Sequence, residues 1–249
     1  MSSNPFSLEQ KLILVTGAAS GIGRSVAVEA SKMGATVILV DLNESQMQET
    51  ISMMSPGEHS FITADLTSNN SINYISEVVD TLDGVVNCAG VGLTLPFKFC
   101  SEKELKRIMS INFFAPVLLV QSLLRAKKIK NKASIVYLAS IDGTQTGHIG
   151  NSAYSASKGA IMGSVRSQAL ELAGKGIRIN CVSPARVNTP LIRRDNISDE
   201  QVLVNMQLYP LKRYAEPEEI AYYIIYLLSD ASTYTTGSNL VIDGGFTLL

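Results

Sequence analysis

Residues 12–23 read Leu-Ile-Leu-Val-Thr-Gly-Ala-Ala-Ser-Gly-Ile-Gly, an apolar run followed by three closely spaced glycines. The run at 12–15 does not alternate with polar residues, which is typical of a strand covered on both faces of a sheet. Beyond the glycines, apolar residues recur at helical spacing as far as Met33, and Gly34 supplies a stop signal. The stretch therefore predicts a buried strand, a tight glycine turn and a helix.

The same order of elements repeats along the rest of the chain. Further apolar runs occupy residues 37–40, 85–86, 135–138 and 240–242, and helical patterns lie between them, the longest at 102–127 and 153–173. Strict alternation of strand and helix is typical of a parallel sheet with right-handed crossovers. We therefore predict one α/β domain over residues 1–249, with a doubly wound parallel sheet and helices on both faces. Its least regular stretch is 184–216.

The composition excludes several classes of protein. The 249 residues include 21 Lys and Arg against 22 Asp and Glu, so neither nucleic acid nor an anionic membrane is an expected partner. The three cysteines have no paired spacing, which favours reduced thiols. Residues 1–10 lack the pattern of a signal peptide, and no apolar run approaches the length of a membrane span. We therefore expect a cytoplasmic protein that binds a small molecule.

The glycine turn is suited to bind phosphate. Glycine permits the positive φ angles of a tight turn and lets the backbone approach a pyrophosphate, and the following helix offers free N–H groups at its positive end. A glycine cluster alone also fits a plain tight turn. Its place after the first strand of a parallel sheet, where ligands of such sheets bind, favours a dinucleotide.

The second strand ends at Asp41, 18 residues after Gly23, near the spacing of about 20 residues at which an acid holds the adenosine ribose. A carboxylate accepts hydrogen bonds from both ribose hydroxyls but repels a 2′-phosphate, so Asp41 predicts NAD(H) rather than NADP(H). The alternative is a solvated acid that caps the helix starting near Asn43. Arg24 would weaken this inference if it reached the ribose, but we expect it to face away.

Tyr154 and Lys158 are four residues apart at the start of a helix, so their side chains project from one face. A nearby cation lowers the pKa of a tyrosine towards neutrality and makes it an acid and base for an alcohol or a carbonyl. Taken alone, the pair fits an exposed helix face better than a site. Ser140 favours the site, because a hydroxyl at the carboxyl end of the strand 134–139 can hold a substrate oxygen beside Tyr154.

Asn112 stands inside the helical pattern 105–124, where asparagine is unfavourable unless its amide or its backbone has a role. Pro116 lacks the N–H that would bond to the carbonyl four residues before it. We therefore expect the Asn112 carbonyl to be free to bind water.

Together these motifs resemble the short-chain dehydrogenase/reductase family. The resemblance covers nearly the whole chain, and the motifs that carry it are Thr16-Gly-x-x-x-Gly-x-Gly23, Asn87-Cys88-Ala89-Gly90, Asn112, Ser140 and Tyr154-x-x-x-Lys158. It implies a Rossmann-like sheet of about seven strands and an oxidoreductase that interconverts a secondary alcohol and a ketone by hydride transfer. Among subfamilies, 3-oxoacyl-acyl-carrier-protein reductases and sugar or polyol dehydrogenases are the most similar.

The resemblance implies a role for each catalytic residue. Tyr154 is the general acid/base, and Ser140 orients and polarises the reacting carbonyl. Lys158 binds the nicotinamide ribose and tunes Tyr154, while Asn112 holds a water that relays protons to bulk solvent. No metal is implied, since His148 has no partner at ligand spacing.

The resemblance also implies the residues that contact NAD(H). Asp65 and Leu66 border the adenine, and the segment from Pro184 to Thr189 closes over the nicotinamide. The full implied set is Gly17, Ser20, Gly21, Ile22, Gly23, Asp41, Leu42, Asp65, Leu66, Asn87, Ala89, Gly90, Tyr154, Lys158, Pro184, Val187 and Thr189. Cys88 and Ala185 depart from the usual Asn and Gly, and we expect a shifted loop geometry rather than lost cofactor binding.

The substrate pocket is expected between residues 91–99, 141–151 and 191–211. Its candidate apolar residues are Leu93, Leu95, Phe97, Ile141, Ile149 and Leu191, and its candidate basic residues are Lys98, His148, Arg193 and Arg194. Each basic residue more often faces solvent than a ligand. Within the family, the last helix and strand and the two long helices commonly pair subunits, so a homotetramer or a dimer is expected. The apolar face with Ile220, Ile224 and Leu227 is equally explained as core.

Two alternatives stay open. An acyl-carrier-protein reductase predicts a basic docking patch near the cleft, for which Arg125, Lys127, Lys128 and Lys130 are candidates, although such a run is usually a solvated helix end. Asp41 is awkward for that alternative, because biosynthetic reductases usually draw on NADPH. The second alternative is a nucleotide sensor or scaffold that has lost catalysis. The presence of all four catalytic residues, Asn112, Ser140, Tyr154 and Lys158, argues against it.

Overall fold

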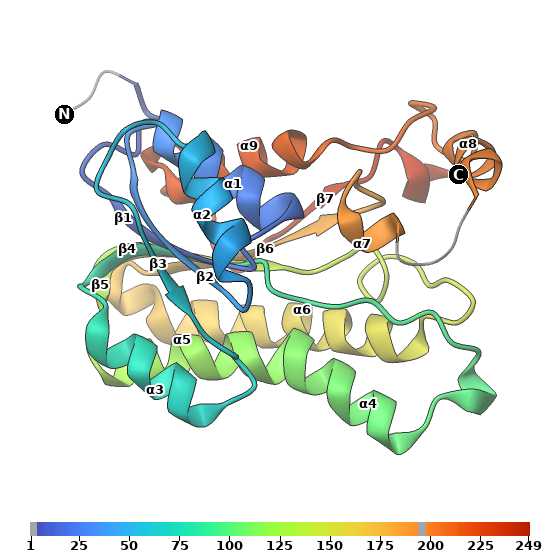
Figure 1. Cartoon of the computed structure of the whole chain (residues 1–249), viewed down its shortest axis with the longest axis horizontal. Coiled ribbons are helices and arrows are strands. Elements are labelled where there is room, and N and C mark those ends of the chain that lie inside the picture. Colours follow the sequence, from blue (N-terminus) through green and yellow to red (C-terminus); the bar gives the residue numbers. More distant parts are fainter. Residues whose placement is uncertain (1–3, 194–197) are drawn as a thin grey trace.

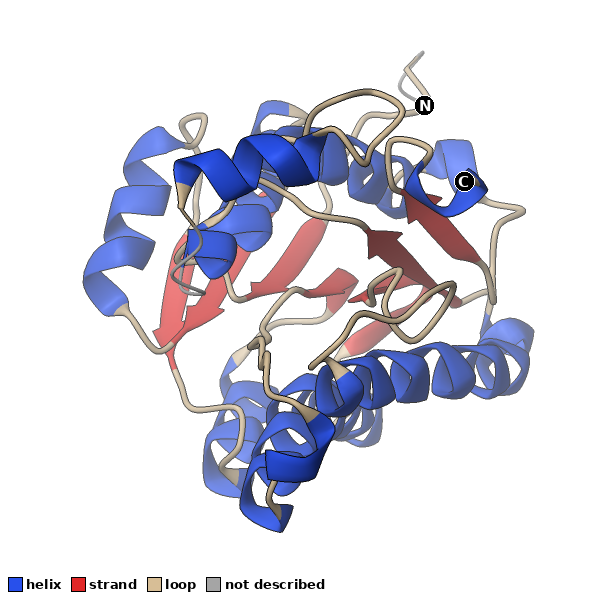
Figure 2. Ribbon diagram, turned by 90° about the vertical axis from the view of Figure 1, so that its right-hand side faces the viewer, coloured by secondary structure: helices blue, strands red, loops and turns tan. Residues whose placement is uncertain are grey.

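The computed structural model describes residues 4–193 and 198–249. Within them, seven parallel strands form one sheet in the order β3-β2-β1-β4-β5-β6-β7 (Figure 1, Figure 2). The strands are β1 (Leu12–Thr16), β2 (Thr36–Asp41), β3 (Ser60–Thr63), β4 (Leu82–Asn87), β5 (Ile129–Leu138), β6 (Arg178–Pro184) and β7 (Asn239–Ile242). The predicted doubly wound α/β fold is confirmed, although no apolar run had marked β3 or β6.

Helices cover both faces of the sheet. The α-helices are α1 (Gly21–Lys32), α2 (Glu44–Met53), α3 (Asn69–Val78), α4 (Glu102–Met109), α5 (Ala115–Arg125), α6 (Ser152–Leu172), α7 (Pro190–Arg193), α8 (Asp199–Met206) and α9 (Pro217–Leu228). A π-helical turn, Ser110–Phe114, joins α4 to α5, and short 3-10 helices span Phe97–Phe99, Ala173–Lys175, Asp230–Ser232 and Phe246–Leu248. Figure 1 shows α1, α2 and α9 on one face and α3, α5 and α6 on the other.

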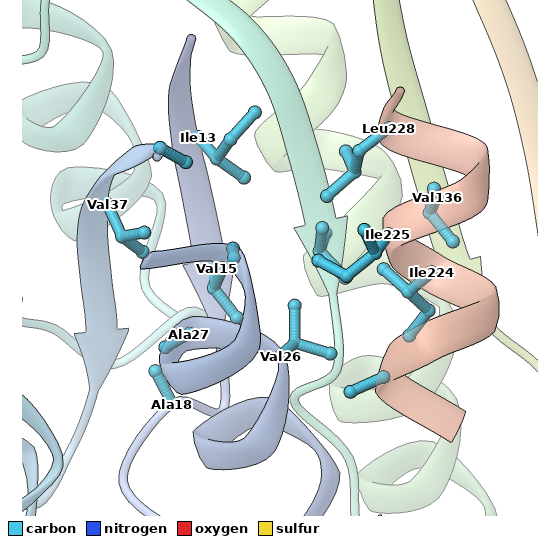
Figure 3. Close-up of a cluster of buried hydrophobic side chains, with 14 of the residues drawn as sticks. Ile13, Val15, Ala18, Val26, Ala27, Val37, Val136, Ile224, Ile225 and Leu228 are labelled. Carbon is cyan, nitrogen blue, oxygen red and sulfur yellow. The ribbon is translucent and has the colours of Figure 1, made fainter. Parts of the chain in front are cut away.

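The core explains why the strand sequences do not alternate. Successive side chains of a strand point to opposite faces, and here each face is covered. Ile13 and Val15 pack under α1 and α9, while Leu14 joins the cluster on the opposite face. In Figure 3, Val26 of α1 points toward Ile224 of α9 above the sheet. The apolar face of α9 is therefore core.

One helical stretch among the described residues, Glu102–Arg125, is long and apolar enough by length and composition to cross a membrane, contrary to the expectation from the apolar runs. Its second half, α5, packs on the sheet. Leu119, Val120 and Leu123 are buried in the cluster beneath β4 and β5. We therefore assign the stretch as a core helix of the α/β fold.

Candidate active site

The turn between β1 and α1 has no room for side chains at two glycines. Gly17 has a φ of +68°, and a Cβ on it would lie 2.7 Å from the backbone nitrogen of Ala89. A Cβ on Gly23 would lie 2.2 Å from the carbonyl oxygen of Gly17. Ser20 precedes α1 without capping it through its side chain, so the first N–H groups of the helix are left for a ligand.

A cleft of about 560 Å³ opens at the carboxyl ends of β1, β2 and β4. The parallel register brings these ends level, since Thr16 lies opposite both Val40 and Asn87. The predicted cofactor residues that line the cleft are Gly17, Ser20, Gly21, Ile22, Gly23, Asp41, Leu42, Asp65, Leu66, Ala89, Gly90 and Thr189. The cleft fits a dinucleotide, because the start of α1 forms one wall, where phosphates can bind, and Asp41 lies in another, where its carboxylate can accept from ribose hydroxyls.

Five predicted cofactor residues are not in the cleft lining: Tyr154 and Lys158, described below, and Asn87, Pro184 and Val187. Asn87 is buried in β4, with its Nδ2 3.5 Å from the Val136 carbonyl oxygen. Pro184 ends β6, where its carbonyl accepts a hydrogen bond from the Ile141 N–H at 3.1 Å. Val187 is buried and forms a backbone bridge to the segment before α9. Asn87, Pro184 and Val187 are buried, so they can support the cleft walls without lining the cleft.

The Asp41 carboxylate is fixed at the end of β2. Its oxygens accept hydrogen bonds from the N–H groups of Ala19 at 3.2 Å and Asn43 at 3.1 Å. Asn43 caps α2 with its own side chain, so the alternative of Asp41 as the cap does not hold. Arg24, which we expected to face away from the ribose, is not among the residues that line the cleft; its guanidinium donates to the Ala19 carbonyl and pairs with Glu49 of α2.

Ser140, Tyr154 and Lys158 meet beside the cleft. Ser140 lies two residues beyond β5, and the other two lie in the first turns of α6. The Ser140 side chain hydrogen-bonds Tyr154, and the Lys158 ammonium lies 5.8 Å from the centre of the Tyr154 ring. Lys158 Nζ donates to the Leu138 carbonyl at 2.7 Å, and a Cβ on Gly90 would lie 3.6 Å from Nζ. The ammonium therefore lies between the phenol and the cleft wall.

Burial shifts the pKa values of both ionisable groups towards their neutral forms. Burial raises the pKa of Tyr154 to about 12; the hydrogen bond with Ser140 opposes this shift, and the charge of Asp142 adds to it. Burial lowers the pKa of Lys158 to about 8. The prediction that Lys158 brings the pKa of Tyr154 towards neutrality is therefore not met, because desolvation of the phenolate is the largest effect and Lys158 is not among the groups that shift this pKa.

Asn112 lies in the π-helical turn and is 1% exposed. Its side chain clamps the loop after β4, since Oδ1 accepts from the Val91 N–H at 2.9 Å and Nδ2 donates to the Val91 carbonyl at 3.0 Å. The same Nδ2 donates to Ser157 Oγ of α6 at 3.1 Å. Asn112 thus joins the cleft wall to the helix that carries Tyr154, a clamp that the sequence did not predict. Pro116 follows the wide turn and cannot donate to the Asn112 carbonyl.

Two of the predicted pocket segments, 91–99 and 141–151, are hydrogen-bonded to each other. The Leu95 N–H donates to the Gly150 carbonyl at 2.8 Å. Ile141 is buried, but Phe97 is 77% and Ile149 is 96% exposed, so these two do not form an apolar wall in this chain. Of the remaining apolar candidates, Leu191 lines the cofactor cleft.

Two of the four basic residues expected in the substrate pocket contact other side chains of the protein, and the side chains of the other two lie outside the described residues. Lys98 Nζ lies 4.8 Å above the Phe99 ring, and His148 pairs with Asp142. The Arg193 side chain and all of Arg194 lie outside the described residues.

The basic run proposed as a docking patch lies far from the cleft. It flanks the amino end of β5, whereas Ser140 follows the carboxyl end of the same ten-residue strand. Lys128 donates to the Val79 carbonyl at 2.7 Å, and Lys130 pairs with Asp83 at 2.8 Å. The prediction of a basic patch near the cleft is therefore wrong for these residues.

Sequence reasoning missed a polar cluster in the turn between β5 and α6. Asp142 is 5% exposed and contacts both His148 and Asn151. An acid two residues after Ser140, at the same edge of the sheet, was the available signal. Asp142 had no apparent partner in the sequence, because its contacts depend on how the turn folds.

Comparisons with known proteins found similar chains. Residues 17–247 match a family model described as enoyl-(acyl carrier protein) reductase. The chain is 33% identical to dehydrogenase/reductase SDR family member 6 of Rattus norvegicus, over 97% of this chain and 99% of that protein. It is also 33% identical to cyclopentanol dehydrogenase of Comamonas testosteroni, over 96% and 98% of the two chains.

A similar solved structure is described as an NAD(P)-dependent gluconate 5-dehydrogenase from Beutenbergia cavernae with bound NADP. Its TM-score is 0.89 at 29% identity, covering 99% of this chain and 100% of that one.

Proposed function

Because the chain belongs to the short-chain dehydrogenase/reductase family, we propose that it is an NAD(H)-dependent enzyme that interconverts a secondary alcohol and a ketone. The observation that carries the proposal is the meeting of Ser140, Tyr154 and Lys158 beside the cleft. Dependence on NAD(P) and action on CH–OH groups follow from the family. The preference for NAD(H) and the roles of individual residues are our proposals.

NAD(H) held in the cleft would supply hydride transfer, from the alcohol carbon in oxidation and to the ketone carbon in reduction. The Tyr154 oxygen takes the hydroxyl proton in oxidation and returns it in reduction. The Ser140 hydroxyl lies beside that oxygen and donates to the substrate oxygen, so that negative charge developing there is stabilised. Lys158, whose ammonium lies 5.8 Å from the centre of the Tyr154 ring, would hold the nicotinamide ribose. Asn112 holds the cleft loop and, through its carbonyl, the water that returns protons to bulk solvent.

The direct test is a panel of secondary alcohols and ketones assayed with NAD(H) and NADP(H) by the absorbance of the reduced cofactor. Turnover of at least one pair, faster with NAD(H), is the expected result. Specific cofactor binding without turnover of any substrate would instead favour a nucleotide sensor.

The pKa of Tyr154 predicts opposite pH dependences for the two directions. With its pKa raised to about 12 by burial, the phenol is protonated near neutral pH. Reduction uses the protonated form, so it should be active at neutral pH and fall at high pH. Oxidation uses the phenolate, so kcat/KM for the alcohol should rise from about pH 7 to about pH 10. Profiles measured in both directions check this, and oxidation independent of pH would contradict it.

Asp41→Ala should relax the preference for NAD over NADP. The carboxylate lies in the cleft wall, held by the N–H groups of Ala19 and Asn43, where it accepts from ribose hydroxyls and repels a 2′-phosphate. We expect KM for NAD to rise about tenfold and KM for NADP to fall, because a charge-assisted hydrogen bond contributes about 1.5–3 kcal/mol. Asp83→Asn is the control, because Asp83 lies at the amino end of β4, whereas the cleft opens at the carboxyl end of that strand. An unchanged ratio of the two KM values would refute our interpretation of Asp41.

Reduction of an acyl-carrier-protein substrate is a second candidate. It is favoured by the description of the family model, enoyl-(acyl carrier protein) reductase. It needs a docking surface other than residues 125–130, which lie at the far end of β5. Comparing a free 3-oxoacyl thioester with its carrier-protein form would separate the two.

We also propose a homo-oligomer, a tetramer or a dimer, in the cytoplasm. Support for assembly comes from apolar side chains that remain exposed along α4, the π-helical turn and α5, namely Leu105, Phe114 and Leu118. Support for the location comes from the three cysteines, which are all free thiols. We propose further that the segment 184–216 covers the cofactor and the substrate, since Thr189 and Leu191 line the cleft.

A further inference from the structure

Asp142 is a buried carboxylate that the proposed mechanism does not use. It lies in the turn between β5 and α6, two residues after Ser140. A carboxylate hidden from water persists as an anion only where hydrogen bonds compensate its lost hydration. Here Oδ1 lies 2.5 Å from Nδ1 of His148, and Oδ2 accepts from Nδ2 of Asn151 at 2.7 Å. The carboxylate is therefore clamped on both oxygens.

The clamp reaches the Ser140 hydroxyl through the backbone. The Asp142 N–H donates to Ser140 Oγ at 3.1 Å. A hydroxyl has one hydrogen to donate and two lone pairs, so this bond uses a lone pair and leaves the hydrogen for Tyr154 or a substrate oxygen. The turn itself is tight, since the N–H groups of residues 144–146 all donate to the Ile141 carbonyl.

The same carboxylate acts on Tyr154 through its charge. The charged groups near the Tyr154 phenol are Asp142 and Lys158. Lys158 also interacts electrostatically with Cys88, and the charge of Asp142 also raises the pKa of Tyr209. Water screens a buried charge only weakly. Asp142 therefore raises the pKa of Tyr154 in addition to the effect of burial.

His148 and Asn151, the two side chains that contact the Asp142 carboxylate, make further contacts of their own. The His148 side chain is 38% exposed and its ring stacks on Phe246 at 5.6 Å. Asn151 in turn accepts from the Thr94 hydroxyl at 3.3 Å, which links the clamp to the loop after β4. The Asp142 cluster thus joins two of the three segments expected around the substrate, 91–99 and 141–151.

We propose that Asp142, held by His148 and Asn151, is a positioning residue that directs the Ser140 hydroxyl and keeps the proton on Tyr154. The proposal rests on the proposed function. Its consequence is a site biased towards giving a proton to a ketone oxygen, because the buried negative charge opposes a second one on the phenol.

Two variants separate charge from geometry. Asp142→Asn removes the charge but keeps the shape, since the new amide has an oxygen that can accept from Asn151 and a second polar atom that can hydrogen-bond His148 Nδ1. Asp142→Ala removes the clamp as well. Asp230→Asn is the control, because Asp230 is an exposed acid that pairs with Lys11 away from the site.

Two measurements read the effect. One is the pH profile of kcat/KM in both directions. The other is the tyrosinate absorbance of each protein minus that of the same protein carrying Tyr154→Phe, which isolates one of the nine tyrosines without any turnover. We expect the apparent pKa of Tyr154 to fall by about one unit in Asp142→Asn and in Asp142→Ala. Only Asp142→Ala should also lose about tenfold in kcat, with KM changed less.

Unchanged titration and pH profiles in Asp142→Asn would overturn the proposal, as would an equal shift in Asp230→Asn. If Asp142→Ala does not fold, Asp142→Asn still decides the question of charge. Failure of the proposed function looks different: the wild-type protein would turn over no alcohol or ketone, while the absorbance titration would still report on Asp142 and Tyr154.

Discussion

Tyr154→Phe is expected to lower kcat by about a thousandfold while NADH binding stays within about twofold. Proton transfer by a placed side chain typically contributes 10² to 10⁴ in rate, and the Tyr154 hydroxyl is the group beside Ser140 and Lys158 positioned to make it. The ring remains in the variant, so packing around it is kept. The measurements are steady-state turnover and a fluorescence titration with NADH.

The matched control is Tyr226→Phe. Tyr226 lies in α9, and its hydroxyl hydrogen-bonds Thr235 at 3.0 Å, away from the cleft. This variant should lose about 1 kcal/mol of folding free energy and no turnover. Turnover retained in Tyr154→Phe would refute the assignment of the acid/base, whereas equal losses in both variants would indicate a general effect on stability.

Gly23→Ala is expected to weaken binding of NAD by more than a hundredfold. The added Cβ would lie 2.2 Å from the Gly17 carbonyl oxygen and 3.2 Å from the Ala18 nitrogen, both backbone atoms. The start of α1 must therefore move away from the loop, and the N–H groups meant for the phosphates move with it. Overpacking of this kind costs about 1–3 kcal/mol of stability as well. Calorimetric titration with NAD and thermal unfolding measure the two effects.

Gly163→Ala offers the same substitution without the clash. Gly163 lies inside α6, and no heavy atom of the described residues comes within 4 Å of its Cβ position beyond its chain neighbours and its own helix backbone. Alanine there should raise stability by about 0.5–1 kcal/mol and leave NAD binding unchanged. Normal NAD affinity in Gly23→Ala would show that the glycine turn does not hold the phosphates.

The sequence predicted the fold class because strands buried on both faces carry continuous apolar runs. It did not mark β6, Arg178–Pro184, because that strand contains Arg178 and Asn180. Both are buried, and they are compensated from afar: Arg178 donates to Ser232 at 2.7 Å and Asn180 to the Thr235 carbonyl at 2.8 Å. Partners more than fifty residues away cannot be recognised in a local pattern.

The candidate site divides in the same way. The glycine turn and Asp41 were predictable, because strand ends and sequence spacing place them. The direction of the Tyr154 pKa shift was not predictable, since it is set mainly by burial, which is a property of the folded chain. The helical pattern 102–127 likewise predicted one continuous helix and did not reveal the π-helical turn at Ser110–Phe114.

That wide turn limits how the length of this chain can vary. Asn112 meets Val91 and Ser157 only because the turn sets its angle around the helix axis. One residue gained or lost between the Ser101 cap of α4 and Pro116 would rotate Asn112 by about 100°. Insertions and deletions among natural variants should therefore avoid this stretch, even though much of α4 is a solvated surface where single substitutions are easily accepted.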